Sequence, residues 1–193
     1  MKIDSLEIPE VKLITPKRFG DHRGFFMETF SAPVLAEAGI ARNWVQDNHS
    51  LSEHPGVLRG LHFQASPHAQ AKLVRVVSGR VWDVAVDVRK GSPTYGKWAA
   101  AELSAENDQQ MFVPEGFAHG FVTLEPGTAF LYKVSNLYAP ESEGGVAWDD
   151  PDLNLPWPLP AGIEPRLSDK DTQLPRLAEL DSPFVYDPEP VTP

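Results

Sequence analysis

Cysteine is absent from this chain of 193 residues, which excludes disulfide bonds, thiolate catalysis and cysteine-ligated zinc or iron–sulfur centres. A metal site would therefore depend on histidine and carboxylate ligands. Long apolar runs are also missing, since none approaches the roughly 20 residues of a membrane-spanning helix. The N-terminus MKIDSLEIPEVK carries acids where a signal peptide would be apolar. We therefore expect a cytoplasmic protein that does not bind membranes.

Basic residues are scarce, because 17 Lys and Arg stand against 27 Asp and Glu, for a net charge of −10. Binding to nucleic acid usually requires a basic surface, so we expect no nucleic-acid partner. A local basic pocket for one small anionic ligand is still compatible with this composition. Hydrophobic residues make up 41% of the chain, which is enough for the core of one domain.

Helical patterns are rare, and the only convincing one is APVLAEAGI, which Gly39 ends. In contrast, RVWDVAVDV alternates with period two, as a strand with two unlike faces does. The preceding KLVRVV predicts a second strand, paired with the first as a hairpin through Ser78 and Gly79. Further short strands are predicted in MFVP, GFVTL and TAFLYKV. The fold class is therefore mainly β, a cupin-type jelly roll or β-sandwich barrel with few short helices and a small-molecule pocket at its mouth.

Proline is frequent, at 19 residues, and much of it lies between Pro151 and Pro193. We predict a single jelly-roll domain over residues 1–171 and a Pro-rich C-terminal extension over 172–193. The segment 151–171 is expected to be extended chain held on the folded body by Leu155 and Trp157. Residues 181–193 are expected to be loosely ordered.

Two histidines occupy promising positions, His62 in LRGLHF and His119 after PEGFA. Cupin metal enzymes place two histidines one residue apart on a first motif and another histidine after a Pro-x-Gly turn. His119 fits the second motif, but Gln64 replaces the second histidine of the first, and Lys72 lies nearby. Two imidazoles beside an ammonium are a poor divalent-cation site, so we expect no metal. The ordinary alternative is that each histidine is structural.

The same strands carry groups suited to proton transfer. By alternation, Tyr132 shares a face with Phe130, and Lys72 shares one with Val74. If these faces line the barrel interior, a phenol, an imidazole and an ammonium converge on one cavity, although Tyr132 alone would be read as a core aromatic. Alternation places Arg59 on the face opposite His62, unless Gly60 marks a bulge that turns one of them.

Several motifs together resemble the dTDP-4-dehydrorhamnose 3,5-epimerases, which are metal-free cupin enzymes without a cofactor. The resemblance runs from about Phe19 to Asp171 and rests on FGDHRGFFMETF, VQDNHS, GVLRGLHFQ, AQAKLVRVVSGRVWDVAVDVRKGSPTYGKW, VPEGFAHGFVTL, YAPESEGGVAWDDP and LSDKD. It implies an isomerase that converts dTDP-4-dehydro-6-deoxy-D-glucose to dTDP-4-dehydro-L-rhamnose through an enolate. It also implies a homodimer in which the N-terminal segment contributes across the interface.

The resemblance implies a role for each matching residue. His62 would be the general base, Asp171 its partner, Tyr132 the general acid and Lys72 the group that stabilises the enolate. Eight residues match polar positions at which the family binds its substrate: Arg23, Glu28, Gln46, Asn48, Arg59, His119, Glu143 and Lys170. Three more match aromatic contacts to the nucleoside: Phe19, Phe26 and Tyr138. The alternatives are an epimerase that inverts only C3 or only C5, a metal-dependent cupin, and a sugar-nucleotide-binding module without activity.

Overall fold

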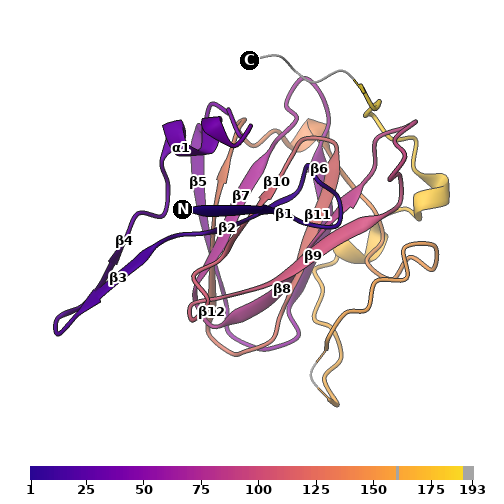
Figure 1. The fold of residues 1–193 in the computed structure, drawn as a ribbon. Helices are drawn as coiled ribbons and strands as arrows, with labels where there is room; N and C mark the ends of the chain where they lie inside the picture. Colours follow the sequence, from indigo (N-terminus) through magenta and orange to yellow (C-terminus); the bar gives the residue numbers. More distant parts are fainter. Residues whose placement is uncertain (160, 189–193) are drawn as a thin grey trace.

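The computed structural model describes residues 1–159 and 161–188, and most of their regular structure is antiparallel β-sheet (Figure 1). One six-stranded sheet has the order β1 (Lys2–Ser5), β2 (Lys12–Thr15), β10 (Gln110–Val113), β7 (Lys72–Ser78), β12 (Thr128–Val134) and β5 (Gln46–Ser52). The facing five-stranded sheet has the order β13 (Glu143–Gly145), β6 (Leu58–Gln64), β11 (Phe117–Thr123), β8 (Arg80–Asp87) and β9 (Trp98–Ser104). The predicted mainly β sandwich is confirmed.

Helical structure is limited to short segments in the described residues. The helix α1 (Ala32–Glu37) lies in the predicted segment, and Gly39 follows it with φ of +80°. Three single turns of 3-10 helix are η1 (Pro140–Ser142), η2 (Asp171–Gln173) and η3 (Leu177–Glu179). No helix in the described ranges is long and apolar enough to cross a membrane.

The two faces of β8 belong to two different clusters of the core. Val81 and Ala85 point between the sheets, where they pack with Val74, Val76 and Phe130 of the opposite sheet. Trp82, Val84 and Val86 belong to a second cluster on the outer face of the five-stranded sheet. The alternation therefore describes two unlike faces, as predicted, and both of them are covered.

The predicted hairpin between residues 72–77 and 80–88 is wrong. Both segments are strands, but β7 pairs with β10 and β12, whereas β8 pairs with β11 and β9 in the other sheet. Gly79, with φ of +74°, turns the chain from one sheet to the other, and a Cβ there would lie 2.3 Å from Thr128 Oγ1. A glycine turn reverses the chain, but it does not determine which strands become hydrogen-bonded neighbours.

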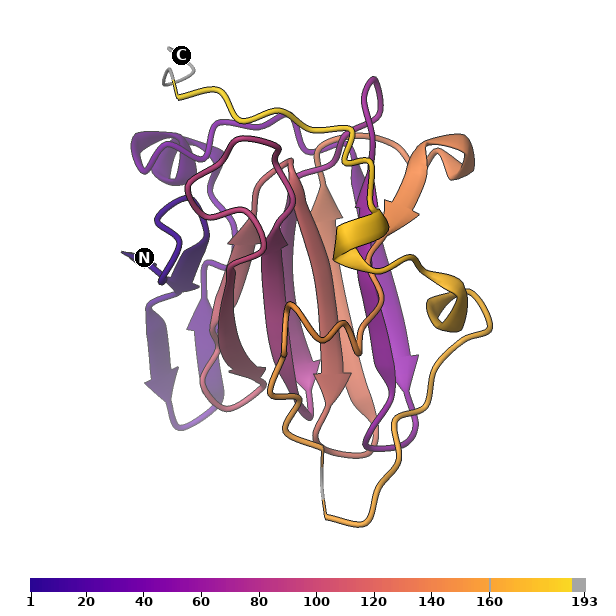
Figure 2. The same cartoon turned by 90° about the vertical axis from the view of Figure 1, so that its right-hand side faces the viewer.

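The C-terminal chain lies across the outer face of the five-stranded sheet (Figure 2). Leu155 and Trp157 pack into the outer cluster as predicted, and the Trp157 ring is 5.1 Å from that of Trp82. Phe184 also belongs to this cluster, and Ser182 donates a hydrogen bond to the carbonyl of Val88. The expectation of loose order is therefore wrong for residues 181–186. Pro160 and residues 189–193 lie outside the described residues.

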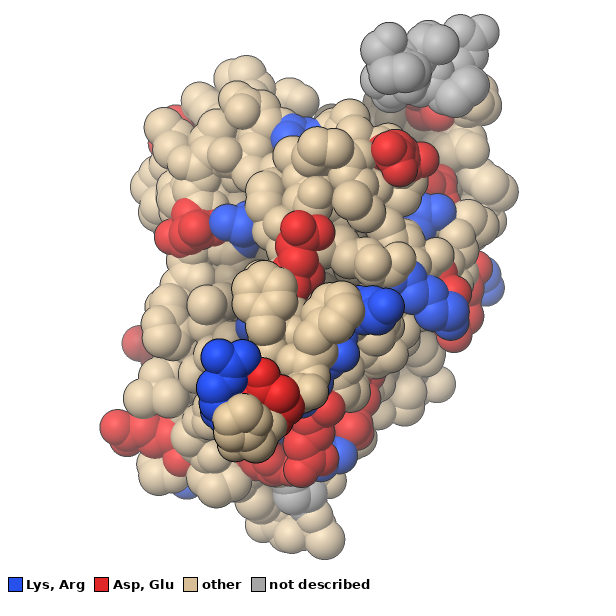
Figure 3. All heavy atoms as spheres, turned by 60° about the vertical axis from the view of Figure 1, so that its left-hand side comes forward, with Lys and Arg blue, Asp and Glu red and all other residues tan. Residues whose placement is uncertain are grey.

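A separate hairpin of β3 (Arg18–Asp21) and β4 (Gly24–Met27) projects from the body of the molecule (Figure 1). Its aromatic residues Phe19 and Phe26 are 53% and 69% exposed. Charges of both signs lie side by side on this side of the molecule (Figure 3), and Arg23 pairs with Asp21 at 2.5 Å. The hairpin thus presents aromatic and charged side chains away from its own core.

Candidate active site

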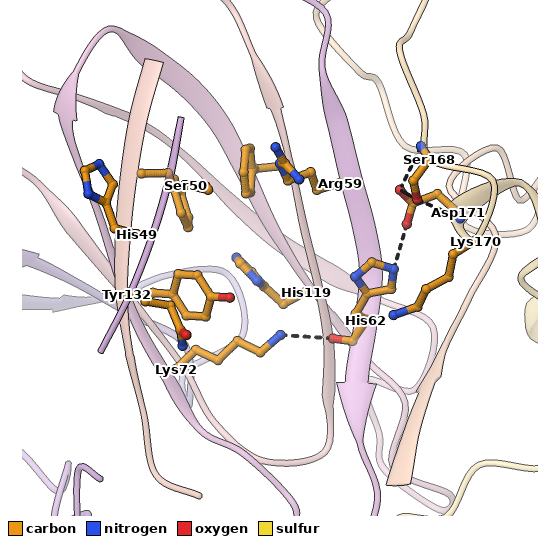
Figure 4. Close-up of a pocket in the computed structure, with 13 residues that line it drawn as sticks. His49, Ser50, Arg59, His62, Lys72, His119, Tyr132, Ser168, Lys170 and Asp171 are labelled. Carbon is orange, nitrogen blue, oxygen red and sulfur yellow. Dashed lines mark hydrogen bonds and ion pairs between the residues drawn. The ribbon is translucent and has the colours of Figure 1, made fainter. Parts of the chain in front are cut away.

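A cavity of about 410 Å³ opens between the two sheets (Figure 4). Its walls bring together residues that are far apart in sequence, on β5, β6, β7, β11 and β12, in the segment before η2 and at the first residue of η2. The lining residues are Asn48, His49, Ser50, Arg59, His62, Lys72, His119, Phe121, Phe130, Tyr132, Ser168, Lys170 and Asp171. All four predicted catalytic residues and four of the predicted substrate-binding residues therefore surround one space.

His62 and Asp171 form a close pair on one wall of this cavity. His62 Nε2 lies 2.7 Å from Asp171 Oδ1, and neither atom has another polar partner among the described residues. The angle of this contact departs from regular hydrogen-bond geometry. The other oxygen of Asp171 accepts from Ser168 Oγ at 2.7 Å. Burial acts to raise the pKa of Asp171, but the contacts with His62 and Ser168 outweigh it and lower the pKa below its usual value.

The backbone at Gly60 determines where His62 and Arg59 point. On β6, His62 pairs with His119 and Arg59 pairs with Phe121, so the register shifts by one residue between the two pairs. Gly60 has φ of +129°, and a Cβ there would lie 2.5 Å from Gly120 Cα. Because of this bulge, Arg59 and His62 line the same cavity, and the question that alternation left open is answered.

Lys72 enters the cavity from β7, on the sheet that faces His62 (Figure 4). Its ammonium donates to the carbonyl oxygen of His62 at 3.3 Å. Burial lowers the pKa of Lys72 to about 8, against the opposing charges of Asp83 and Glu143. The side chain is therefore mostly charged at pH 7 but loses its proton at moderately basic pH.

Tyr132 stands on β12 and points into the cavity from the wall opposite His62 (Figure 4). Its ring packs beside Phe130, with 6.0 Å between the centroids. Burial raises the pKa of Tyr132 above its usual value, although the charge of Arg59 acts in the other direction. The phenol therefore stays protonated at neutral pH, as a proton donor must.

His119 pairs with a buried acid that the sequence analysis did not select. Its Nε2 lies 2.9 and 3.1 Å from the two carboxylate oxygens of Asp83, and Asp83 is fully buried. Burial lowers the pKa of His119 and raises that of Asp83, and each partner acts against the shift of the other. A second imidazole–carboxylate pair thus lies beside the first.

The family model for dTDP-4-dehydrorhamnose 3,5-epimerases matches residues 5–179. The chain belongs to this family. Membership confirms the resemblance and the expectation of an epimerase that acts on a dTDP-linked sugar.

Three relatives illustrate how close the match is. The dTDP-4-dehydrorhamnose 3,5-epimerase of Shigella flexneri is 51% identical over 182 residues, which cover 94% of this chain and 98% of the relative. The Legionella pneumophila epimerase, solved in complex with dTDP-4-keto-L-rhamnose, is 46% identical with a TM-score of 0.91 and coverages of 96% and 98%. A 3'-monoepimerase of Streptomyces bikiniensis, in complex with dTDP-quinovose, is 37% identical with a TM-score of 0.84 and coverages of 90% and 87%.

Other predicted substrate residues of this epimerase contact residues that line the cavity. Gln46 donates to Asn48 Oδ1 at 2.8 Å. Glu143 accepts from the hydroxyl of Tyr138 at 3.1 Å and forms an ion pair with Lys170. Their side chains thus form polar contacts that adjoin the cavity lining.

The structure does not bring the N-terminal candidates to this cavity. Phe19, Arg23 and Phe26 are on the projecting β3–β4 hairpin, and Glu28 is exposed just after it. Five lining residues were missed by the sequence analysis: His49, Ser50, Phe121, Phe130 and Ser168. His49 and Ser50 directly follow the selected Asn48, and Ser168 lies in the LSDKD motif, so their neighbours were the available signal.

The position that a cupin metal ligand would occupy is used structurally. The amide of Gln64 donates to the carbonyls of His68 and Leu137, and its oxygen accepts from the Ala139 amide. Within residues 1–159 and 161–188, no group of three or more His, Asp or Glu side chains is placed to hold a metal ion. The geometry of the described side chains thus offers proton-transfer groups in pairs with carboxylates.

Proposed function

We propose that His62 and Tyr132 carry out the proton transfers by which this epimerase converts dTDP-4-dehydro-6-deoxy-D-glucose to dTDP-4-dehydro-L-rhamnose. The observation that carries the proposal is their arrangement. They extend from facing sheets into one cavity, with a carboxylate behind the imidazole. Inversion beside a ketone requires removal of a proton from one face of the sugar and delivery of another to the opposite face.

His62 is the base in this proposal. The C4 ketone acidifies the hydrogens on C3 and C5, and the imidazole takes one of them as the electron pair moves into the enolate. Asp171 lies 2.7 Å from Nε2. Because Asp171 contacts Nε2, Nδ1 is the nitrogen that accepts the proton. The carboxylate of Asp171 then stabilises the imidazolium that results.

Tyr132 is the acid, and Lys72 stabilises the intermediate. The enolate carbon takes the phenol proton from the opposite face, which gives the inverted centre. Solvent then returns a proton to the phenolate and takes one from the His62 imidazolium. Negative charge on the C4 oxygen is stabilised by the ammonium of Lys72, which lines the same cavity. In a water-poor cavity such a fixed positive group stabilises the transition state by about 3 to 4 kcal/mol.

We also propose that the cavity mouth holds the dTDP group. Arg59 and Lys170 supply positive charge there, and pyrophosphate oxygens accept strong hydrogen bonds from such groups. The Legionella relative carries dTDP-4-keto-L-rhamnose in its structure, which supports a dTDP-sugar as the ligand. A cytoplasmic location fits an enzyme that acts on a soluble nucleotide sugar, and stays a prediction.

A homodimer is part of this proposal. The exposed hairpin carries Phe19, Arg23 and Phe26 away from the cavity of its own chain, so these residues would contact substrate only in a partner subunit. Mixing an Arg23→Ala variant with a His62→Ala variant tests this arrangement. Hybrid dimers contain one intact site, so re-association should restore about a quarter of wild-type activity. No restoration would contradict it.

The second candidate is inversion at a single carbon, as in the 37% identical 3'-monoepimerase, and it is the weaker one because the 51% identical Shigella flexneri relative is a 3,5-epimerase. Both activities use the same acid and base, so the described side chains support either. NMR of the product formed by the wild-type enzyme decides between them. Inverted configurations at both C3 and C5 support the double epimerase, and inversion at one carbon would overturn it.

A further inference from the structure

The buried carboxylate of Asp83 is not among the residues to which the proposed reaction assigns a role. Asp83 lies on β8 and is fully buried, and it does not line the cavity. An unpaired carboxylate in such a position lowers the free energy of unfolding by an amount on the order of several kcal/mol. A hydrophobic residue would fill the same place at no such cost, so the acid requires an explanation.

The position of Asp83 is defined by its contact with His119 on the neighbouring strand. In the register of β8 and β11, Asp83 pairs with Phe121 and His119 pairs with Ala85, so the two side chains are diagonal neighbours on the inner face. His119 Nε2 contacts both carboxylate oxygens, at 2.9 and 3.1 Å. The imidazole also stacks on Phe130 at 6.3 Å, and the Phe130 ring stacks on Phe121 at 4.1 Å.

We propose that Asp83 is a positioning residue of the active site, which holds His119 in its Nε2–H tautomer and balances the charge of the Lys72 ammonium. An ionised carboxylate only accepts hydrogen bonds, so Nε2 must carry the proton and Nδ1 is left as the acceptor. His119 then presents the cavity with an acceptor for a substrate hydroxyl. The part of this inference that concerns the pH dependence of kcat/KM rests on the proposed function, whereas the part that concerns the tautomer of His119 does not.

The charges around the cavity give Asp83 its second effect. Lys72 lies close to the His119–Asp83 pair, because its ammonium donates to the carbonyl of His62, the strand partner of His119. The charges of Asp83 and Glu143 raise the pKa of Lys72 and that of Lys170 lowers it, whereas His119 is affected by the charges of Asp83, Lys72 and His62. Among the groups that favour the charged form of Lys72, Asp83 has the largest effect. It is also fully buried, so solvent screens it little, whereas Glu143 is already paired with Lys170.

An Asp83→Asn variant tests this role through its pH profile. The amide can still accept from Nε2 but carries no charge, so Lys72 loses its proton at lower pH. We expect the loss of kcat/KM relative to wild type to be about sixfold greater at pH 8.5 than at pH 6.5, which corresponds to a drop of about one unit from the wild-type Lys72 pKa of about 8. A loss of the same size at both pH values would show a merely structural role and overturn the proposal.

Asp87→Asn is the matched control. Asp87 is equally buried and lies on the same strand, but its carboxylate binds Arg89, Ser92 and Thr94 outside the cavity. The variant should lose stability and keep the wild-type shape of the pH profile. A shift of the basic limb equal to that of Asp83→Asn would remove the specific role of Asp83.

A measurement on the wild-type protein keeps the proposal testable if Asp83→Asn does not fold. Long-range ¹H–¹⁵N NMR of histidine-labelled enzyme reports the tautomer of His119, assigned by its loss in a His119→Gln variant. The Nε2–H tautomer supports the proposal, and the Nδ1–H tautomer would overturn it. This measurement uses no substrate, so it is independent of whether the wild-type enzyme turns over the dTDP-sugar as proposed.

Discussion

Replacement of Lys72 by methionine should make the protein more stable and far less active. Burial lowers the pKa of Lys72 from 10.5 to about 8, so the folded protein holds an ammonium less readily than the unfolded chain does. The folded pKa lies below the unfolded one. Stability therefore rises as the pH increases from about 8 to 10.5, and the full penalty is present below pH 8.

The size of the effect follows from the shift. A difference of about 2.5 pKa units corresponds to roughly 3 kcal/mol at pH 7 and roughly 2 kcal/mol at pH 9, where part of the ammonium has already lost its proton. These values already include the attraction of Asp83 and Glu143, which acts against the effect of burial on the pKa of Lys72. For a chain of this length, 3 kcal/mol raises the melting temperature by roughly 6 to 12 °C.

Urea unfolding of both proteins at pH 7 and pH 9, at one protein concentration, measures the difference. We expect Lys72→Met to be the more stable protein, with an advantage that shrinks as the pH rises. Its kcat should fall by a factor of roughly 10² to 10³, as expected for loss of one preorganised charge. A less stable variant, or an advantage independent of pH, would refute the reasoning.

Two further predictions concern the structure around the site. Gly60→Ala should cost roughly 2 to 5 kcal/mol of stability, because its Cβ would clash with Gly120 at a positive φ. The control Gly127→Ala, with φ of +66° and open space around it, should cost only about 1 kcal/mol, and equal costs of the two variants in thermal unfolding would contradict this prediction. Phe184→Ala should lower the free energy of unfolding in urea by about 3 kcal/mol, because the ring packs in the outer cluster. The control Val185→Ala, at a residue that is 76% exposed, should change it by less than about 0.5 kcal/mol. If Phe184→Ala leaves the stability unchanged, the C-terminal chain does not stabilise the sheet.

Much of the fold could be predicted from local patterns. The alternation in RVWDVAVDV defined both faces of β8, and Gly39 marked the end of α1. The partner of each strand could not be predicted in this way, because residues 72–78 and 80–87 are joined by an ordinary glycine turn and still enter different sheets. Strand pairing depends on contacts that are distant in sequence.

The site was predictable where a motif marked it and not where burial created it. His62, Lys72, Tyr132 and Asp171 all line the cavity. Asp83 was missed although an acid in the middle of an apolar strand is unusual, since only the fold shows that it lies beside His119. The direction of Arg59 also required the register shift at Gly60, which alternation cannot reveal.

Deuterium exchange catalysed by two active-site variants and one control variant tests the central claim, that His62 is the base and Tyr132 the acid. The dTDP-4-keto sugar is incubated in D₂O with His62→Ala, with Tyr132→Phe and with His54→Ala, which removes an exposed histidine remote from the cavity. We predict no deuterium at the carbons beside the ketone with His62→Ala, exchange without net inversion with Tyr132→Phe, and wild-type behaviour with His54→Ala. Rapid exchange with His62→Ala, or full inversion with Tyr132→Phe, would contradict the account.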